Sequence, residues 1–357
     1  MDAIKILKKA LELGASDIHL SVGTQPAFRI NGRLTRWYID DDKSYKLTHD
    51  EIMDFIREVM DQEKLASWRE NGEIDFSFSI PSYSRFRINC YRQRGCPSLA
   101  IRPVPYEIPP LDVLGVPEAI ISLIEKKNGL ILVTGTTGCG KSTTLAALIN
   151  KINKEEEKHI ITIEDPIEYL YQHEKSIIDQ RELGSDTFSF AKALRSCLRQ
   201  DPDVILIGEM RDLETISTAI TAAETGHLVL ATLHTNSAAQ SIDRIIDIFP
   251  PNQQEQIKVQ LAATLQGIIT QQLLPRADGN GMALASEVLI TVPAVRNLIR
   301  EGKTHQITTV LQTGTRWGMQ TMDISLRNLV LKNMVKIDTA MNYTNDKESF
   351  ARCLNMM

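Results

Sequence analysis

Cysteine is scarce in this sequence, and its few copies show no pairing pattern. The five cysteines are Cys90, Cys96, Cys139, Cys197 and Cys353. An odd number of cysteines, with no two spaced as Cys-x-x-Cys, indicates neither a disulfide framework nor a zinc ribbon. The composition therefore favours a reducing compartment, and we expect the protein to be cytoplasmic.

Long apolar runs are also missing. No stretch of the sequence is apolar for long enough to cross a bilayer. Residues 1–6 mix an acid and a lysine with apolar residues, where a signal peptide needs an uninterrupted apolar stretch. We therefore expect a chain that is neither exported nor membrane-spanning.

An excess of positive charge is the third absence. The sequence has 40 lysines and arginines against 45 acidic residues, a formal net charge of −5, which gives no overall attraction to nucleic acid. The hydrophobic fraction of 43% and the charged fraction of 24% are typical of a soluble globular protein. Because 357 residues exceed the length that one hydrophobic core usually supports, we expect two domains.

The first part of the chain has the pattern of a small α+β domain. Residues 4–11 carry apolar side chains at helical spacing, and a short apolar run follows around residues 18–20. Residues 75–80 and 85–89 then alternate apolar and polar side chains, as half-buried strands do, with residues 81–84 as the turn between them. We predict an amino-terminal domain over residues 1–102.

A cluster of prolines follows this domain. It comprises Pro103, Pro105, Pro109 and Pro110. Proline lacks the N–H that a helix or a sheet needs, so this stretch is predicted to be an extended linker over residues 103–113. Residues 114–357 then form the second predicted domain.

Four apolar runs in the second domain alternate with helical segments. They are residues 130–133, 160–163, 204–207 and 228–231. Strands that are apolar on both faces indicate a parallel sheet covered by helices on both sides, and residues 190–198 have the apolar face of one such helix. Ligands of these sheets bind beyond the carboxyl ends of the strands, so we expect the four ends to form one site.

The run at residues 130–133 leads into a phosphate-binding loop. The sequence Gly-Thr-Thr-Gly-Cys-Gly-Lys-Ser at residues 135–142 stands between a strand and a helix, as the P-loop motif requires. Its backbone N–H groups surround phosphate oxygens, Lys141 reaches the β- and γ-phosphates, and the Ser142 hydroxyl ligates Mg²⁺. The sequence therefore predicts a site for ATP and Mg²⁺. The predicted nucleotide-binding residues are Gly135, Thr136, Thr137, Gly138, Cys139, Gly140, Lys141, Ser142 and Thr143.

Cys139 occupies a position of the loop that is usually serine. Because the backbone makes the phosphate contacts there, we expect little cost in binding. A thiol beside a phosphate group is, however, expected to make the enzyme sensitive to oxidation.

The other three apolar runs end in polar side chains. Gly208 stands where many P-loop enzymes have an acid that ligates the metal, which leaves Glu209 to polarise the attacking water. The loop at residues 164–168 contributes Glu164 as a candidate metal ligand and Glu168 as a candidate catalytic residue. His234 is placed to hydrogen-bond the γ-phosphate or sense its loss. The alternatives are a solvated glutamate at a strand end and an acidic loop without function.

These segments together resemble a family. In chain order, residues 135–142, 163–169, 198–212 and 225–237 resemble the Walker A motif, Asp box, Walker B motif and His box of secretion and pilus ATPases. The resemblance covers nearly the whole chain, including residues 15–20. It implies an α/β fold, a RecA-like P-loop NTPase core with a smaller α+β, PAS-like amino-terminal domain, and a homo-hexameric ring that hydrolyses ATP.

One further segment distinguishes members of this family. Residues 293–301 resemble the Ala-Ile-Arg-Asn-Leu-Ile-Arg motif of type IV pilus retraction ATPases, with Val295 as the single departure. The resemblance favours pilus retraction and twitching motility over pilus assembly, as does the lack of a tetracysteine metal site. On a helix, Arg296 and Arg300 share one face, so an ordinary solvated basic face is the alternative.

The family resemblance also implies arginines that act on the ATP of a neighbouring subunit. Such arginines stabilise the charge that develops on the γ-phosphate. Arg87 and Arg102 are the predicted ones, with Arg85 and Arg92 as weaker candidates. An ordinary surface arginine is the alternative at each position.

The implied partners are those of the pilus machinery. The resemblance implies an inner-membrane platform protein at the cytoplasmic face, with peripheral membrane contact only and no direct contact with nucleic acid. A pilus assembly or type II secretion ATPase, a non-catalytic nucleotide-dependent regulator of a partner motor, and a nucleic-acid translocase stay open as alternatives.

Overall fold

The structure of the chain is a computed structural model. It describes residues 2–30, 32–38, 42–81, 83–104, 107–344 and 347–355, and within the last range only the backbone of residues 349, 352, 353 and 355. Pro105 of the predicted linker, Ser82 of the predicted turn and the side chain of Cys353 therefore lie outside the described residues. The chain divides into two compact units, Met1–Glu107 with Pro166–Leu170, and Ile108–Asp165 with Tyr171–Met357.

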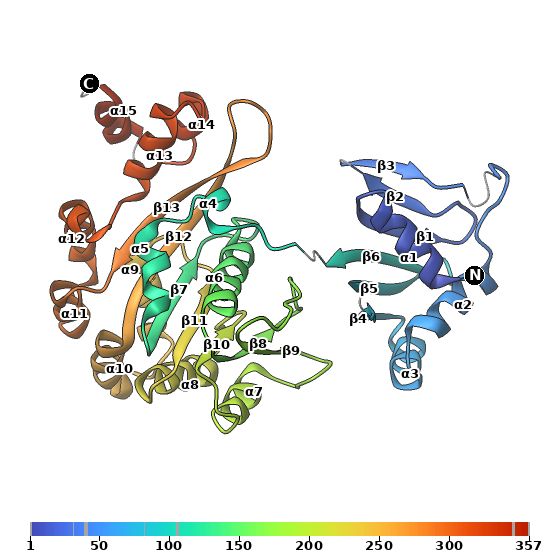
Figure 1. Cartoon of the computed structure of the whole chain (residues 1–357), viewed down its shortest axis with the longest axis horizontal. Coiled ribbons are helices and arrows are strands. Elements are labelled where there is room, and N and C mark those ends of the chain that lie inside the picture. The colour runs from blue at the N-terminus through green and yellow to red at the C-terminus, as the bar shows by residue number, and fades with distance from the viewer. Residues whose placement is uncertain are drawn as a thin grey trace. The chain divides into compact units, whose positions relative to one another are not determined.

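The first unit is built on a six-stranded antiparallel sheet in the order β3-β2-β1-β6-β5-β4 (Figure 1). Its strands are β1 (Ala15–Ser21), β2 (Ala27–Ile30), β3 (Arg33–Arg36), β4 (Glu73–Ile80), β5 (Ser84–Gln93) and β6 (Cys96–Val104). Its helices are α1 (Ala3–Glu12), α2 (His49–Val59) and α3 (Gln62–Asn71). The predicted first helix and strand and the predicted pair of alternating strands are confirmed as α1, β1, β4 and β5.

Short polar residues set where these helices begin. Thr48 and Glu51 form a reciprocal capping box at the start of α2, which satisfies two backbone N–H groups that a helix leaves unpaired. The side chain of Asp61 caps α3, and Gly72, in the left-handed conformation, ends it. The sheet and helices enclose a core that includes the fully buried rings of Phe28 and Phe86.

The second unit is built on a seven-stranded sheet in the order β13-β12-β7-β11-β10-β8-β9, parallel except for β13. Its strands are β7 (Gly129–Thr134), β8 (His159–Glu164), β9 (Ile177–Glu182), β10 (Val204–Ile207), β11 (Leu228–Leu233), β12 (Leu265–Pro275) and β13 (Met282–Ile290). The four predicted apolar runs are β7, β8, β10 and β11, and they are neighbours in the sheet. The prediction of a parallel sheet is confirmed.

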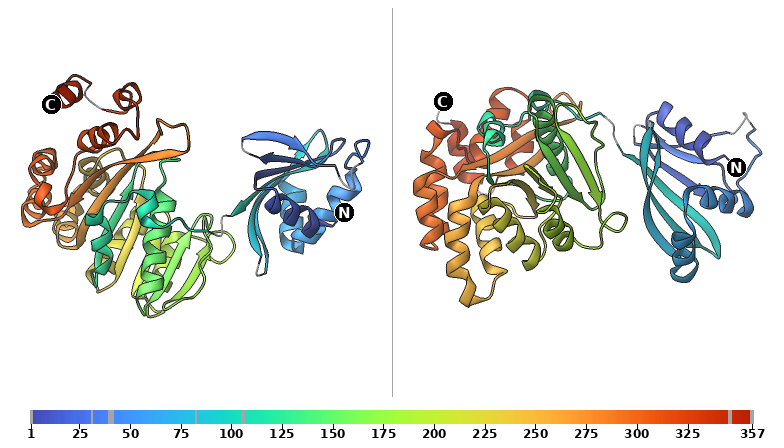
Figure 2. Two further views of the ribbon diagram at one scale, coloured as in Figure 1. Left: turned by 45° about the horizontal axis from the view of Figure 1, so that its top comes forward. Right: turned by 60° about the horizontal axis from the view of Figure 1, so that its bottom comes forward.

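Helices cover both faces of this sheet (Figure 2). The covering helices are α4 (Leu111–Leu114), α5 (Glu118–Ile121), α6 (Lys141–Glu155), α7 (Phe190–Cys197), α8 (Leu213–Glu224), α9 (Ala238–Asp247) and α10 (Pro251–Thr264). Along β7, Leu130 and Leu132 pack with α7 to α10, whereas Ile131 and Val133 pack with α5 and α6. Because successive side chains of a strand point to opposite faces, an apolar run that is buried throughout requires both layers.

Short helices follow the last strand. They are α11 (Pro293–Arg300), α12 (Ile307–Thr313), α13 (Met322–Leu331), α14 (Ile337–Met341) and α15 (Lys347–Asn355). The last three enclose a separate small core with Leu274 of β12 and with Ala283 and Ala285 of β13. Within the described part of the chain, no helix combines the length and apolar character that a membrane span needs.

Candidate nucleotide site

The phosphate-binding loop connects β7 to α6. Helix α6 begins after Gly140, which is in the left-handed conformation with φ 87°, and no side chain caps its amino terminus. The ammonium group of Lys141 instead donates hydrogen bonds to the carbonyl oxygens of Gly135 (2.8 Å) and Thr136 (2.9 Å) within the loop. Burial lowers the pKa of Lys141, and the charge of Glu209 opposes that effect. An uncapped helix amino terminus beside a buried ammonium group is suited to bind phosphate.

The tight path of the loop depends on Gly135. A β-carbon on this residue would lie 2.5 Å from Cys139 Sγ and 2.5 Å from the carbonyl oxygen of Gln271, and its φ is +139°. No other amino acid fits both the space and the backbone conformation. Thr136, Thr137, Gly138 and Ser142 are exposed, so the outer rim of the loop is open to a ligand.

Cys139 is held inside this loop. Its side chain is only 3% exposed, and burial raises the pKa of its thiol, although the nearby Lys141 charge acts in the opposite direction. Since the thiolate is the form that reacts with oxidants, this environment disfavours the oxidation sensitivity that the sequence suggested.

Glu209 follows β10 and contacts two side chains, those of Arg211 and His234. Its carboxylate oxygen Oε1 lies 2.5 Å from Arg211 Nε and 3.3 Å from His234 Nε2. Burial acts to raise the pKa of Glu209, but the hydrogen bonds and charges of Arg211 and His234 outweigh it and lower the pKa. The structure thus brings together two of the predicted residues, Glu209 and His234, with the carboxylate ionised.

Gly208 lies close to the end of the neighbouring strand β8. A β-carbon at this position would lie 3.2 Å from the Cα atom of Glu164 and 3.2 Å from the carbonyl oxygen of Ile163, both at the end of β8. These distances are shorter than ordinary van der Waals contacts. A side chain at position 208 would therefore require the end of β8 to shift by a few tenths of an ångström.

The carboxylate of Glu164 lies at the end of β8. It is buried, and its Oε1 atom accepts hydrogen bonds from the Thr162 hydroxyl (2.7 Å) and the Gln180 amide (3.3 Å). Glu168 belongs to the segment that groups with the first unit and is exposed.

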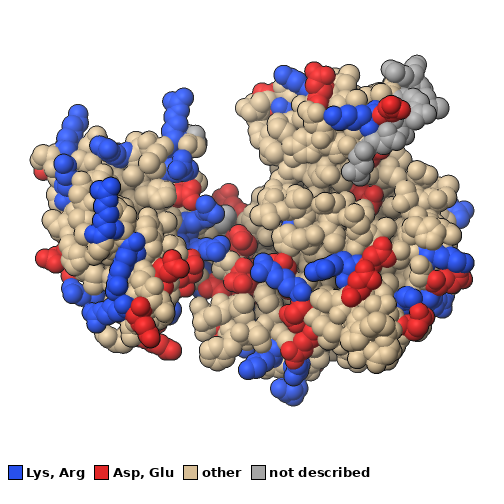
Figure 3. All heavy atoms as spheres, turned by 180° about the vertical axis from the view of Figure 1, so that it is seen from behind, with Lys and Arg blue, Asp and Glu red and all other residues tan. Residues whose placement is uncertain are grey.

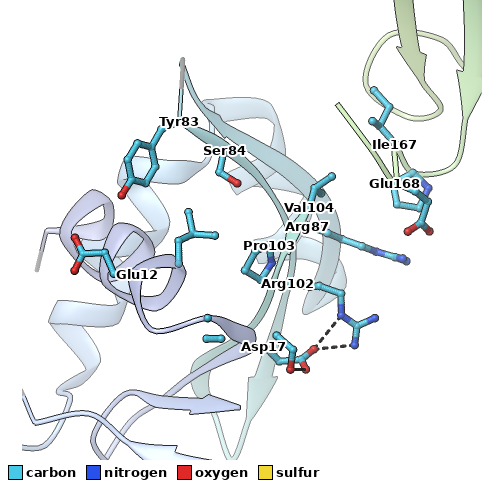
Figure 4. Close-up of a pocket in the computed structure, with 15 residues that line it drawn as sticks. Glu12, Asp17, Tyr83, Ser84, Arg87, Arg102, Pro103, Val104, Ile167 and Glu168 are labelled. Atoms are coloured by element: carbon cyan, nitrogen blue, oxygen red, sulfur yellow. Dashed lines mark hydrogen bonds and ion pairs between the residues drawn. The ribbon is translucent and has the colours of Figure 1, made fainter. Parts of the chain in front are cut away.

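The predicted trans-acting arginines lie side by side in the first unit. Arg87 of β5 and Arg102 of β6 are directly opposite each other in the sheet register, and both are exposed (Figure 4). Arg102 donates hydrogen bonds to Asp17 Oδ1 from Nε (3.0 Å) and Nη2 (2.7 Å). Like charges directly opposite each other destabilise a sheet, and the ion pair between Arg102 and Asp17 offsets this repulsion.

The two weaker arginine candidates make contacts within their own unit. Arg92 donates a hydrogen bond to the carbonyl oxygen of Arg69 (2.8 Å), and its guanidinium lies 5.3 Å from the centroid of the Trp68 ring. Arg85 donates to the Ser79 hydroxyl at 3.2 Å. Both sets of contacts are those of residues that stabilise the fold.

Helix α11 carries the segment that resembles the retraction motif. Val295 and Ile299 are fully buried in the main core. Arg300 is exposed. Arg296 is half-buried, and its guanidinium donates hydrogen bonds to the carbonyl oxygens of Ala262 and Ala263 at the end of α10. The alternative of a solvated basic face therefore describes Arg300 but is wrong for Arg296.

Three residues that bind or adjoin candidate residues within their own unit have no counterpart in the sequence predictions. Arg211 is bound to Glu209. The sequence feature that could have indicated this pair is a basic residue two positions after the acidic one. Asp17 accepts hydrogen bonds from Arg102, although the two residues are 85 positions apart in the sequence. Gln271 of β12 is bound to Thr144 of α6. Because β12 also contains Gln266, Thr270 and Gln272, the sequence does not distinguish Gln271 from the other polar residues of this strand.

Comparison with known proteins gives concordant matches over almost the full length. A model of the type II/IV secretion system protein family matches residues 2–350. The chain is 46% identical over 326 residues to a twitching motility protein of Neisseria gonorrhoeae, covering 91% of this chain and 86% of that protein. It is 42% identical over 350 residues to the type IV pilus retraction ATPase PilT of Pseudomonas aeruginosa, covering 98% and 100%. A crystal structure of the pilus retraction motor PilT with bound ADP matches with a TM-score of 0.90, 48% identity and 99% coverage of both chains.

Proposed function

The chain belongs to the type II/IV secretion system protein family, and from that membership we propose that it is an ATP-hydrolysing motor that powers retraction of type IV pili. The family resemblance seen in the sequence is thereby confirmed, as is the fold class of a RecA-like ATPase core with an amino-terminal domain. The relatives named for twitching motility and pilus retraction support the choice of retraction.

The observation that carries the proposal is the position of the phosphate loop and of Glu209 along one rim of one sheet. β7 and β10 are parallel strands separated only by β11. The loop follows the carboxyl end of β7, Glu209 follows that of β10, and His234 follows that of β11. This is the arrangement in which a triphosphate and its attacking water meet.

Within the second unit we assign the nucleotide to residues 135–143. The exposed rim of this loop and the uncapped start of α6 fit phosphate oxygens, and Lys141 exchanges the carbonyl oxygens of Gly135 and Thr136 for the β- and γ-phosphates. The exposed Ser142 hydroxyl fits Mg²⁺, which neutralises developing charge on the phosphates when it is bound. Glu164 is the second proposed metal ligand, acting from the end of β8.

Glu209 is proposed to orient the attacking water. Its lowered pKa keeps it ionised at neutral pH, and an ionised carboxylate accepts hydrogen bonds from water. His234, in contact with the same carboxylate, is proposed to respond to the γ-phosphate, and Glu168 is proposed as a further catalytic carboxylate.

We further propose a homo-hexameric ring in which Arg87 and Arg102 act on the ATP of a neighbouring subunit. In this proposal residues 1–102 and 114–357 are the moving domains, joined by residues 103–113. The motor works at the cytoplasmic face of the inner membrane through a platform protein. On the face of the larger unit seen in Figure 3, acidic and basic side chains are interspersed, which favours a protein partner over a nucleic acid there.

ATP turnover of the purified full-length protein tests the chemistry. We expect Lys141→Ala and Glu209→Gln each to lower kcat by at least about 100-fold, whereas Glu301→Gln, an exposed glutamate paired with Lys303, stays at the wild-type rate. Near-wild-type rates in both site variants would contradict the assignment of the P-loop and Glu209. Absence of turnover in the wild type would favour a non-catalytic regulator.

A genetic complementation tests the direction of the motor. We expect the gene to restore twitching to a strain that assembles pili but does not retract them, and the Lys141→Ala variant to fail at equal protein level. Restoration of assembly in a non-piliated strain, without twitching, would instead identify an assembly ATPase.

A further inference from the structure

One residue of β12 contacts both the start of the phosphate loop and the first turn of the helix that follows the loop. The backbone carbonyl of Gln271 packs against Gly135, as shown by its 2.5 Å distance from the point where a β-carbon on Gly135 would lie. The side-chain amide of the same residue donates a hydrogen bond to Thr144 Oγ1 at 2.7 Å. Gly135 opens the loop, and Thr144 lies in the first turn of α6.

Thr144 and Ser142 lie on opposite sides of that helical turn. Two positions along an α-helix correspond to a rotation of about 200°. When Thr144 faces the sheet, Ser142 therefore faces the opposite side, where the ligand is proposed to bind. Thr144 is 3% exposed and Gln271 is 0% exposed, while Ser142 is exposed. The hydrogen bond between Gln271 and Thr144 therefore sets the rotation of the turn that carries Lys141 and Ser142.

The side chain of Gln271 satisfies the buried Thr144 hydroxyl but also carries a cost in stability. Its other polar atom, Oε1, is buried and has no hydrogen-bond partner among the described residues, and an unpaired buried acceptor costs free energy. Ile269, two positions earlier on the same face of the strand, packs into the apolar core beneath α6. A methionine at position 271 would fill similar volume without this cost.

We propose that Gln271 is a positioning residue for ATP hydrolysis, which fixes the width of the phosphate loop by holding Gly135 and the first turn of α6 in register. This inference rests on the proposed function. It adds a residue outside the recognised motifs, 127 positions from the threonine that it binds. Small errors in the placement of Lys141 and Ser142 reduce the rate of phosphoryl transfer strongly, because the catalytic effect depends on geometry.

A double-mutant cycle on the assembled full-length protein tests the proposal. We expect Gln271→Met and Thr144→Val each to lower kcat/KM about 10-fold, and the double variant to lower it by the same factor, since both changes remove one interaction. Thr144→Ser keeps the hydroxyl and is expected to stay within about twofold of wild type. Affinity for a fluorescent ADP analogue is expected to fall no more than about threefold, because the loop backbone still binds the diphosphate.

Gln272→Met is the matched control. Gln272 is the next residue of β12, so its side chain points to the opposite face, and its Oε1 atom is also buried without a partner. We expect turnover of this variant to stay within about twofold of wild type. A purely structural role for Gln271 would instead lower the midpoint of thermal unfolding in parallel with activity.

Three results would overturn the inference while leaving the proposed function intact. They are wild-type kcat/KM in Gln271→Met, multiplication of the two single effects in the double variant, and equal losses in the two glutamine variants. If Gln271→Met fails to fold, the comparison of kcat/KM between Thr144→Val, which lacks the hydroxyl, and Thr144→Ser, which keeps it, tests the same hydrogen bond. Absence of ATP turnover in the wild type would refute the proposed function itself.

Discussion

Replacement of Arg296 by alanine is expected to destabilise the second unit. The guanidinium of Arg296 donates hydrogen bonds to the carbonyl oxygens of Ala262 and Ala263 (2.7 Å to the latter) and approaches Gln266 Oε1 at 3.5 Å. The two carbonyls belong to the last turn of α10, where a cation is also favoured by the helix dipole. Arg296 therefore fastens α11 to the end of α10.

The magnitude follows from these contacts. A hydrogen bond from a charged donor contributes about 1.5–3 kcal/mol. Arg296 is only half-buried, and burial also lowers its pKa, so desolvation offsets part of the gain. We expect Arg296→Ala to cost about 2–3 kcal/mol, which for a unit of this size lowers the unfolding midpoint by roughly 5–10 °C. Arg296→Lys keeps the charge but not the planar fork, and is expected to lose about half as much.

Arg300 is the internal control for this experiment. It lies one turn further along α11, is exposed, and contacts Asn297 of its own helix. Exposed side chains of this kind contribute about 0.5 kcal/mol or less, so Arg300→Ala is expected to shift the midpoint by less than about 2 °C.

Thermal unfolding followed by circular dichroism is the assay. A two-domain chain need not unfold in one step, so the transition of the second unit is identified as the one that ADP shifts upward. Equal midpoints for Arg296→Ala and Arg300→Ala would refute the reasoning. If the predicted difference is found, loss of pilus retraction in an Arg296 variant reflects, at least in part, the detachment of α11 from α10.

Three shorter predictions concern pH, space and reactivity. Burial acts to lower the pKa of His159, but its hydrogen bond to Asp179 (3.0 Å) and those to nearby carbonyls outweigh it and raise the pKa. The raised pKa of His159 contributes its whole stabilisation at pH values below the pKa in the unfolded chain, about 6.5. The stabilisation is lost as the pH rises through the higher pKa of the folded protein. The unfolding midpoint of wild type should therefore exceed that of His159→Gln at pH 6 and approach it at pH 8.5; a constant difference would contradict this. Gly208→Ala should lower ATP turnover by pressing on the end of β8 and cost about 1–3 kcal/mol in urea unfolding, whereas unchanged values in both assays would show that the strand yields freely. Thiol labelling read by mass spectrometry should modify the half-exposed Cys96 well before the buried Cys139, and the reverse order would restore the expectation of an oxidation-sensitive loop.

The sheet of the second unit and its phosphate loop could be predicted because their signals are local. An apolar run such as residues 204–207 is buried on both faces whichever helices cover it, so composition alone indicates a parallel strand. The P-loop is fixed by short-range requirements, since Gly135 and Gly140 adopt backbone conformations that few other residues accept. The family resemblance then supplied the order of the remaining motifs.

The contacts that hold the charged groups could not be predicted in the same way. Arg102 binds Asp17 across 85 positions, and Gln271 binds Thr144 across 127. Helical or strand periodicity carries no information about partners at such separations, because they meet only after the sheets have formed. Arg296 shows the same limit. Helical spacing indicates only that Arg296 shares a face with Arg300, and packing of α11 on α10 brings carbonyl oxygens to Arg296.

Three of the charged groups proposed for the chemistry already have a partner within their own unit. Lys141 is bound to carbonyl oxygens of its loop, Glu209 to Arg211 and His234, and Arg102 to Asp17. ATP binding therefore exchanges one charge-assisted hydrogen bond for another and leaves no buried charge unpaired. An exchange of similar interactions has a small net free energy, so binding and release can both proceed readily. A motor that must repeat its cycle requires this property, whereas a protein that stores its nucleotide permanently does not.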